Sequence, residues 1–151
     1  MKADELGDRA ELLTALSKKH LSLLASVAEE ASYPPSEVIF REDQPADEFY
    51  IIEKGLVGLE LATPGLEPLV ILSLCPNELL GISWMFPPYR WQWTARAITG
   101  SQLLVFDAAQ VRQWCEEDPD LKLWVLQMVA AQAVKRLHTT RVQLMDLYEA
   151  R

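Results

Sequence analysis

The sequence predicts a mainly β domain, a sandwich or barrel, with helices at both ends. Between residues 38 and 107, six short segments rich in β-branched and aromatic residues alternate with turn formers. Before residue 31 and after residue 107, apolar residues instead recur at helical intervals. With 151 residues, half of them hydrophobic, the chain suits a single domain over residues 1–151 that has its own core.

The N-terminal part, residues 1–33, is expected to be helical. Apolar residues recur at helical spacing from Leu6 to about residue 31, and the pattern is interrupted near Ser17. Ser17 is a suitable N-cap for a second helix over residues 18–31. Two prolines, Pro34 and Pro35, are expected to end this helix.

The central part, residues 36–107, is expected to hold the strands. Turn formers such as Lys54-Gly55 and Thr99-Gly100 separate the segments. Short strands at this spacing are typical of a sandwich or barrel. The predicted strands cover residues 38–40, 49–53, 56–61, 69–74, 94–98 and 103–107.

The C-terminal part, residues 108–150, is expected to form a short helix capped by Asp107 and a long helix that begins at Pro119. One face of the long helix should cover the barrel; it carries Leu121, Trp124, Val125 and Met128. A second face has the alternating spacing of four and three that is typical of a coiled coil. This seam consists of Leu126, Ala130, Ala133, Leu137, Thr140, Leu144 and Leu147. We expect it to form a parallel homodimer; the alternative is that both faces pack within one subunit.

The overall charge argues against a nucleic-acid partner. The net charge is −8, whereas a DNA or RNA surface requires clustered Lys and Arg. The first ten residues are charged where a signal peptide needs an apolar run, and no stretch is as long as a membrane span. We therefore expect a cytoplasmic protein with no membrane association.

The metal ligands of the sequence are few. Cys75 and Cys115 are far apart and are expected to be reduced structural thiols. Together with His20 and His138 they provide too few ligands for a structural zinc cluster.

Three segments together resemble the cyclic-nucleotide-binding domains of catabolite-activator-type regulators and kinase regulatory subunits. They are SEVIFREDQPADEFYIIEKGLVGLEL (36–61), NELLGISWMF (77–86) and TARAI (94–98). The resemblance covers about residues 12–148 and implies a jelly-roll β-roll, or double-stranded β-helix, with a long dimerising C-terminal helix. Transcription factors of this family continue into a helix-turn-helix, which has no counterpart among these 151 residues. We therefore expect a stand-alone domain that does not bind DNA directly.

The resemblance places function in a phosphate-binding cassette. In the family, backbone N–H groups at a short helix, an arginine and a small hydroxyl hold the cyclic phosphate, and a glutamate binds the ribose. Here Gly81 matches the family glycine, Ile82 stands where the glutamate should be, and Ser83 follows it.

The arginine position is also altered. Counting back six residues from Ala97 gives Trp91, and Gln92 then occupies the small-residue position. Arg90 is one residue away, a shift that in a strand turns a side chain to the opposite face. On the C-terminal helix, Thr140 best matches the hydroxyls that contact the purine in the family. The candidate ligand-binding residues are Gly81, Ile82, Ser83, Arg90, Trp91, Gln92 and Thr140, with cAMP or cGMP as the conceivable ligand.

Three functional classes remain in competition. An enzyme is disfavoured because two histidines support no Ser-His-Asp or Cys-His set. A cyclic-nucleotide sensor would signal through movement of its C-terminal helix. An interaction module without cofactor would act through a protein partner, and this is the function that the altered cassette favours.

Overall fold

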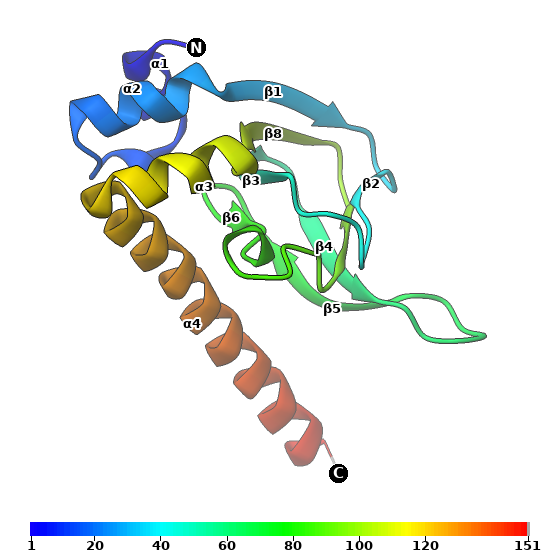
Figure 1. Ribbon diagram of the computed structural model, residues 1–151. Coiled ribbons are helices and arrows are strands. Elements are labelled where there is room, and N and C mark those ends of the chain that lie inside the picture. Colours follow the sequence, from blue (N-terminus) through cyan, green and yellow to red (C-terminus); the bar gives the residue numbers. More distant parts are fainter. Residues whose placement is uncertain (151) are drawn as a thin grey trace.

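The protein is a β-roll with helices at both ends (Figure 1). The computed structural model describes residues 1–150. Within them the strands form two four-stranded sheets, ordered β1-β8-β3-β6 and β2-β7-β4-β5, and every strand pair is antiparallel. The fold is therefore mainly β with flanking helices, as the sequence predicted.

All six predicted strands are confirmed, with boundaries within two residues. Two further strands, β1 and β6, were not predicted. The eight strands are β1 Ala28–Tyr33, β2 Val38–Phe40, β3 Glu48–Lys54, β4 Val57–Leu61, β5 Leu69–Leu74, β6 Leu79–Leu80, β7 Thr94–Ala97 and β8 Ser101–Asp107.

The N-terminal segment differs from the prediction in its last six residues. Helix α1 (Ala3–Arg9) and a single 3₁₀ turn, η1 (Glu11–Leu13), precede helix α2 (Lys18–Ser26), whose N-cap Ser17 accepts a hydrogen bond from the backbone N–H of His20. The predicted continuation of this helix to residue 31 is wrong, and so is the assignment of residues 1–33 as entirely helical. Residues 28–33 pair along their whole length with β8, so long-range strand pairing outweighs the local helical spacing.

Arg9 attaches the N-terminal helix to the first sheet. Its guanidinium forms two hydrogen bonds to the carboxylate of Glu53 in β3, at 2.9 and 2.6 Å, and a further ion pair to Glu30 in β1. These carboxylates raise the pKa of Arg9 above its ordinary value. The helical cap is thus fixed to the sheet that carries β1, β8 and β3.

The C-terminal helices begin where the sequence predicted. Asp107 caps α3 (Ala108–Glu117) by accepting a hydrogen bond from the N–H of Gln110 at 3.0 Å. Asp118 caps α4 (Pro119–Glu149) in the same way, through the N–H of Leu121 at 3.2 Å. Asp118 also accepts from His20 Nε2 at 2.8 Å, which links α2 to the start of α4.

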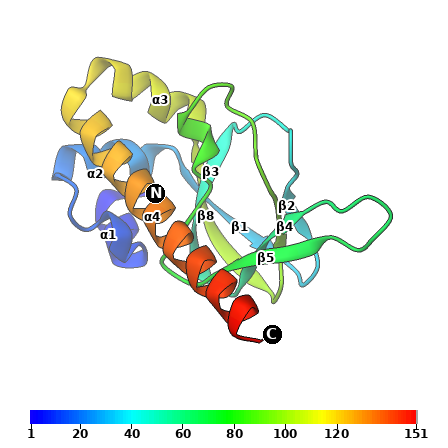
Figure 2. The same cartoon turned by 90° about the horizontal axis from the view of Figure 1, so that it is seen from below.

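Helix α4 buries residues of its N-terminal half against the roll, and its C-terminal half runs past β5, where Gln143, Asp146 and Leu147 lie beside Leu69–Ile71 (Figures 1 and 2). The face predicted to cover the barrel does so, because Leu121, Val125 and Met128 are buried and Trp124 is half-buried. Over residues 1–150, none of the helices combines the length and the apolar character that crossing a membrane requires.

Candidate functional site

The segment that follows β6 has the backbone expected of a cassette. β6 leads into Gly81 at φ +101°, and the single 3₁₀ turn η2 (Ser83–Met85) follows. Trp84 anchors η2, since its side chain is fully buried and its Nε1 donates to the carbonyl of Gly81 at 3.0 Å. Its ring also stacks on Phe49, with the centroids 4.1 Å apart.

Trp91 fills the interior of the roll opposite this turn. Only 4% of Trp91 is exposed, and its ring stacks on Phe40 with the centroids 3.9 Å apart. A Cβ added to Gly81 would lie 2.6 and 2.8 Å from two atoms of the Trp91 ring. Because Gly81 has no Cβ, another group can lie directly against its backbone, and here that group is the indole ring of Trp91.

The backbone of residues 89–91 explains why Trp91 points inward. The N–H of Trp91 donates to the carbonyl of Gln44 at 3.0 Å, and the carbonyl of Trp91 accepts from the N–H of Asp43 at 2.9 Å. Arg90 forms an isolated bridge with Pro45. This extended pairing gives neighbouring residues opposite orientations.

Arg90 accordingly lies on the exposed side. Its Nη1 donates to the carbonyl of Asp43 at 2.6 Å in an exposed hydrogen bond. Gln92 is also exposed, whereas Ile82 and Ser83 are half-buried beside Gly81. Among the predicted ligand-binding residues, the structure brings Gly81 and Trp91 into contact and directs Arg90 to the surface.

Thr140 is exposed on α4. Its hydroxyl donates to the carbonyl of Arg136, one turn earlier, at 2.8 Å. The other leucines of the predicted seam from residue 137 onward are exposed: the exposed fraction is 71% for Leu137, 55% for Leu144 and 68% for Leu147. Earlier in the seam, Ala130 is exposed, and Leu126 and Ala133 are half-buried.

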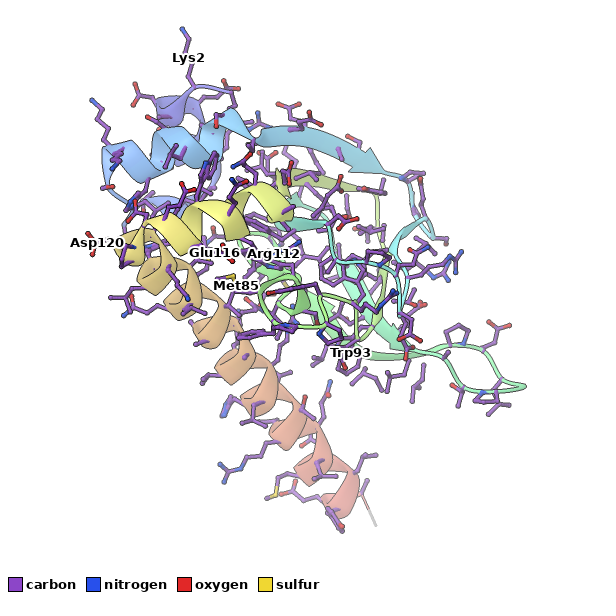
Figure 3. The ribbon with its side chains drawn as sticks, viewed as in Figure 1. Lys2, Met85, Trp93, Arg112, Glu116 and Asp120 are labelled. Atoms are coloured by element: carbon purple, nitrogen blue, oxygen red, sulfur yellow. The ribbon has the colours of Figure 1, made fainter. Side chains whose placement is uncertain are left out.

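Two arginines have structural roles that the sequence did not reveal. Arg112 lies on α3 (Figure 3). It donates to the carbonyl of Trp84 at 2.7 Å and to that of Ala46 at 3.2 Å, and its guanidinium lies 4.5 Å from the centroid of the Tyr89 ring. It thereby joins α3 to η2 and to the segment before β3. No short-range pattern in the sequence indicates this, since the partners are 23 to 66 residues away.

Arg96 is the second of these arginines. Its Nε pairs with Glu60 at 2.9 Å and its Nη1 donates to the carbonyl of Ser36 at 2.8 Å. Glu60 is buried, with 5% of its surface exposed. Arg96 therefore neutralises a buried carboxylate inside the second sheet.

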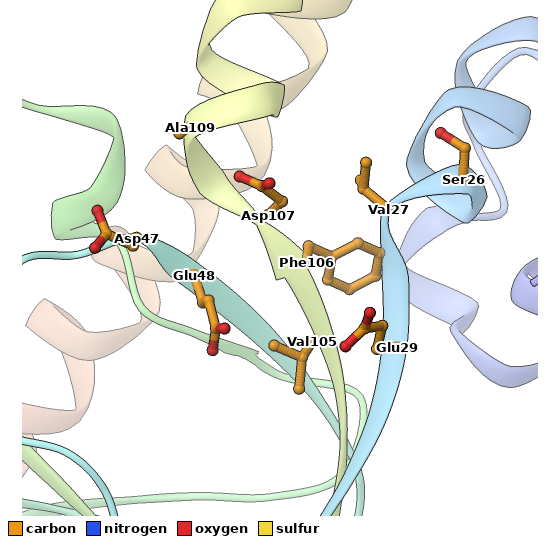
Figure 4. A pocket seen from close by; sticks show the side chains of 9 residues that line it. All are labelled: Ser26, Val27, Glu29, Asp47, Glu48, Val105, Phe106, Asp107 and Ala109. Atoms are coloured by element: carbon orange, nitrogen blue, oxygen red, sulfur yellow. The ribbon is translucent and has the colours of Figure 1, made fainter.

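A separate acidic hollow of about 480 Å³ lies beside β1, β3 and β8 (Figure 4). Two of its carboxylates already have structural roles: Asp107 caps α3, and Glu48 accepts from the hydroxyl of Tyr50 at 3.1 Å. Within residues 1–150, no group of three His, Cys, Asp or Glu side chains could hold a metal ion. The charge of this hollow disfavours an anionic ligand. The lining residues are Ser26, Val27, Glu29, Asp47, Glu48, Val105, Phe106, Asp107 and Ala109.

These features define a β-roll regulatory domain of the cyclic-nucleotide-binding type. Residues 30–118 match the family described as "Cyclic nucleotide-binding domain", and the chain belongs to this family. A curated relative, the CRP-like cAMP-activated global transcriptional regulator of Mycobacterium tuberculosis, is 24% identical over 144 residues. These cover 95% of this chain and 62% of the relative, so the chain spans less than two thirds of that regulator.

Solved structures share the fold. A protein of Geobacter metallireducens assigned as a cyclic nucleotide-binding protein is 26% identical and has a TM-score of 0.81, with 91% of this chain and 99% of that chain covered. A cyclic nucleotide-binding domain from Methylobacillus flagellatus has a TM-score of 0.80 at 15% identity, with 95% and 84% covered. The jelly-roll fold implied by the resemblance is thus confirmed.

Proposed function

We propose that this protein is a non-enzymatic regulatory module whose cassette does not hold a cyclic phosphodiester, and that it acts through a protein partner in the cytoplasm. The observation that carries the proposal is the contact between Trp91 and Gly81, which fills the space in front of the cassette turn with an indole. Arg90, the cation next to Trp91 in the sequence, is engaged on the outer surface by the Asp43 carbonyl.

The energetic argument concerns two missing anchors. A hydrogen bond to a charged group contributes about 1.5 to 3 kcal/mol, and each ~1.4 kcal/mol changes a dissociation constant tenfold. With Ile82 and Trp91 in place of the acid and the guanidinium, a micromolar nucleotide site becomes a millimolar one or weaker. The surrounding Phe40 and Trp91 rings favour apolar packing over an anion.

Calorimetry tests this proposal. Titration of the chain with cAMP and cGMP up to millimolar concentration is expected to give no saturable heat. Arg90→Gln serves as the comparison variant, because the proposal predicts that it behaves like the wild type. Micromolar binding that is abolished in Arg90→Gln would refute the proposal.

The alternative is a functional cyclic-nucleotide sensor that signals by movement of α4. It is favoured by the cAMP-activated relative and by Gly81, which keeps a positive φ at the cassette turn. In this case Arg90 would have to leave the Asp43 carbonyl and reach the phosphate, and saturable binding would depend on it.

We further propose a parallel homodimer through the seam of α4. The support is the alternating spacing of the seam together with the exposure of Leu137, Leu144 and Leu147. Sedimentation or light scattering should give twice the chain mass. Leu137→Glu should shift the protein towards the monomer. Met145→Glu is the control, because Met145 is apolar and exposed but lies off the seam, and it should leave the dimer intact. A wild-type protein that stays monomeric at high concentration would contradict the dimer.

The charge distribution suggests the kind of partner. Between residues 37 and 80 the sequence is strongly acidic, and a basic protein surface would complement it, with association that weakens in salt. Catalysis is not part of the proposal, since His20 is already paired with Asp118 and His138 is an exposed residue of α4. Recovery of one stoichiometric, basic partner without bound nucleotide is the expected outcome of affinity purification.

A further inference from the structure

Trp91 belongs to a row of aromatic rings that crosses the roll. Its ring stacks on Phe40, with the centroids 3.9 Å apart. The six-membered part of its indole lies against Gly81, where an added Cβ would be 2.6 Å from Trp91 Cη2 and 3.7 Å from Trp84 Cδ1. The Trp84 ring in turn stacks on Phe49, with the centroids 4.1 Å apart. Two indoles therefore lie against the backbone of Gly81, and one of them belongs to η2.

The backbone fixes the indole of Trp91 in this position. The N–H of Trp91 donates to the carbonyl of Gln44 at 3.0 Å, and its carbonyl accepts from the N–H of Asp43 at 2.9 Å. The N–H of Ala46 donates to the carbonyl of Tyr89 at 2.7 Å. A free ligand loses translational and rotational freedom when it binds, whereas this side chain has already lost its freedom on folding. The indole is therefore present in the roll of every folded molecule.

The position of η2 depends on these rings. Its two backbone hydrogen bonds, donated by the N–H groups of Met85 and Phe86, are long, at 3.3 Å each, in keeping with the poorer hydrogen-bond geometry of 3₁₀ helices. The buried ring of Trp84 anchors the turn, and the ring of Trp91 fills the space in front of Gly81. Without the Trp91 ring the turn would be free to shift, because glycine is the residue with the greatest backbone freedom.

Arg112 connects η2 to the C-terminal helices. Its Nη1 donates to the carbonyl of Trp84 in η2 at 2.7 Å and to the carbonyl of Ala46 at 3.2 Å. The first N–H of α3, that of Ala108, donates to the carbonyl of Asp47 at 3.0 Å. The position of α3 is thus tied to η2 on one side and to the segment 43–47 on the other, and the indole contacts or bonds with both.

We propose that Trp91 is a tethered ligand of the roll: its indole holds η2, and through Arg112 also α3, in one arrangement without a bound small molecule. This inference rests on the proposed function, because a nucleotide in the cassette would need the space that the indole fills. A ligand shifts an equilibrium between two arrangements by binding one of them more tightly, and a tethered ring does so in every molecule. The module then stays in one state whatever small molecules are present, and its regulation passes to the protein partner.

Removal of the ring and its replacement by free indole provide the test. Trp91→Ala leaves an apolar space beside Phe40, and apolar cavities of this kind bind small aromatic molecules. Amide hydrogen exchange of the full chain is followed by nuclear magnetic resonance. In Trp91→Ala, the amides of η2 and those of residues 112–117 in α3 should exchange at least about tenfold faster than in the wild type. Saturating indole should restore both sets of rates, and it should leave the wild type unchanged.

Two further variants control for unspecific effects. Trp124→Ala removes a half-buried ring of α4 and leaves no enclosed cavity, so its exchange rates should not respond to indole. Arg112→Leu removes the connection between η2 and α3. In that background Trp91→Ala should still accelerate exchange in η2 but should cause no further change in α3.

The outcome in α3 decides the inference. Wild-type exchange of residues 112–117 in Trp91→Ala, or a rise that indole does not reverse, would refute the tethered ligand. If Trp91→Ala does not fold, Trp91→Leu takes its place, because it retains apolar bulk but lacks the ring; the same rise in α3 is expected, and its absence contradicts the inference. Saturable binding of cAMP by the wild type would overturn the proposed function instead, whereas unchanged α3 exchange without such binding overturns the tethered ligand alone.

Discussion

The contact between Gly81 and Trp91 predicts a specific energetic coupling. Gly81→Ala places a methyl group 2.6 Å from the Trp91 ring and requires a non-glycine residue at φ +101°. The backbone conformation costs about 1 to 3 kcal/mol, and overpacking against the indole adds about 1 to 3 kcal/mol. The free energy of unfolding should therefore fall by about 2 to 6 kcal/mol.

A double-mutant cycle separates the two contributions. Trp91→Leu removes the ring, so Gly81→Ala in that background should cost only the backbone part, with a coupling of about 1 to 3 kcal/mol between the sites. Gly65→Ala is the control: Gly65 has φ +75°, and an added Cβ would have no heavy atom within 4 Å. Urea denaturation gives all the values. If Gly81→Ala is no worse than Gly65→Ala, or if the two changes are additive within about 0.5 kcal/mol, the indole does not fill the cassette turn.

Three further predictions concern the framework. Arg96→Leu leaves the buried Glu60 carboxylate unpaired and should lower the free energy of unfolding by about 3 kcal/mol in urea, with much of the loss recovered by Glu60→Gln in the same chain. Hydrogen bonds from His20 and the N–H of Leu121 hold the pKa of Asp118 below its usual range. Its charge therefore stabilises the fold above pH 4, and this stabilisation is lost as the pH falls through the lowered pKa. Asp118→Asn keeps a capping oxygen but has no charge to lose, so acid titration should show a smaller loss of stability between pH 5 and pH 2 than in the wild type. Burial raises the pKa of Cys115 to about 11, so iodoacetamide at pH 8 should modify the exposed Cys75 in the native protein and Cys115 only after unfolding.

The sequence predicted most of the roll because its signals are local. Turn formers and β-branched runs place six strands, and Asp107 and Pro119 place both C-terminal helices. β1 was missed because Ala28–Tyr33 has no strand pattern of its own; its partner, β8, lies about 70 residues later. β6 was missed because two residues carry no periodicity.

The candidate site was less predictable, for a related reason. The family resemblance identified Gly81 as the cassette glycine and indicated that Trp91 replaces the family arginine. It could not show that the ring of Trp91 lies against Gly81 and Phe40, because that contact joins three separate segments. The same limit applies to Arg112, since the residues around it come from segments far apart in the sequence.

The retained glycine shows why a fold motif does not by itself establish a ligand. At Gly55, φ is +98° and an added Cβ would lie 2.6 Å from the carbonyl of Gly100, so the backbone of the roll alone requires glycine there. At Gly81, the atoms that exclude a Cβ belong to a side chain of the cassette, the ring of Trp91. The same glycine could thus serve a bound phosphate in one protein and an internal indole in another. The ligand is determined by the residue that faces the glycine, and in this chain that residue is a tryptophan.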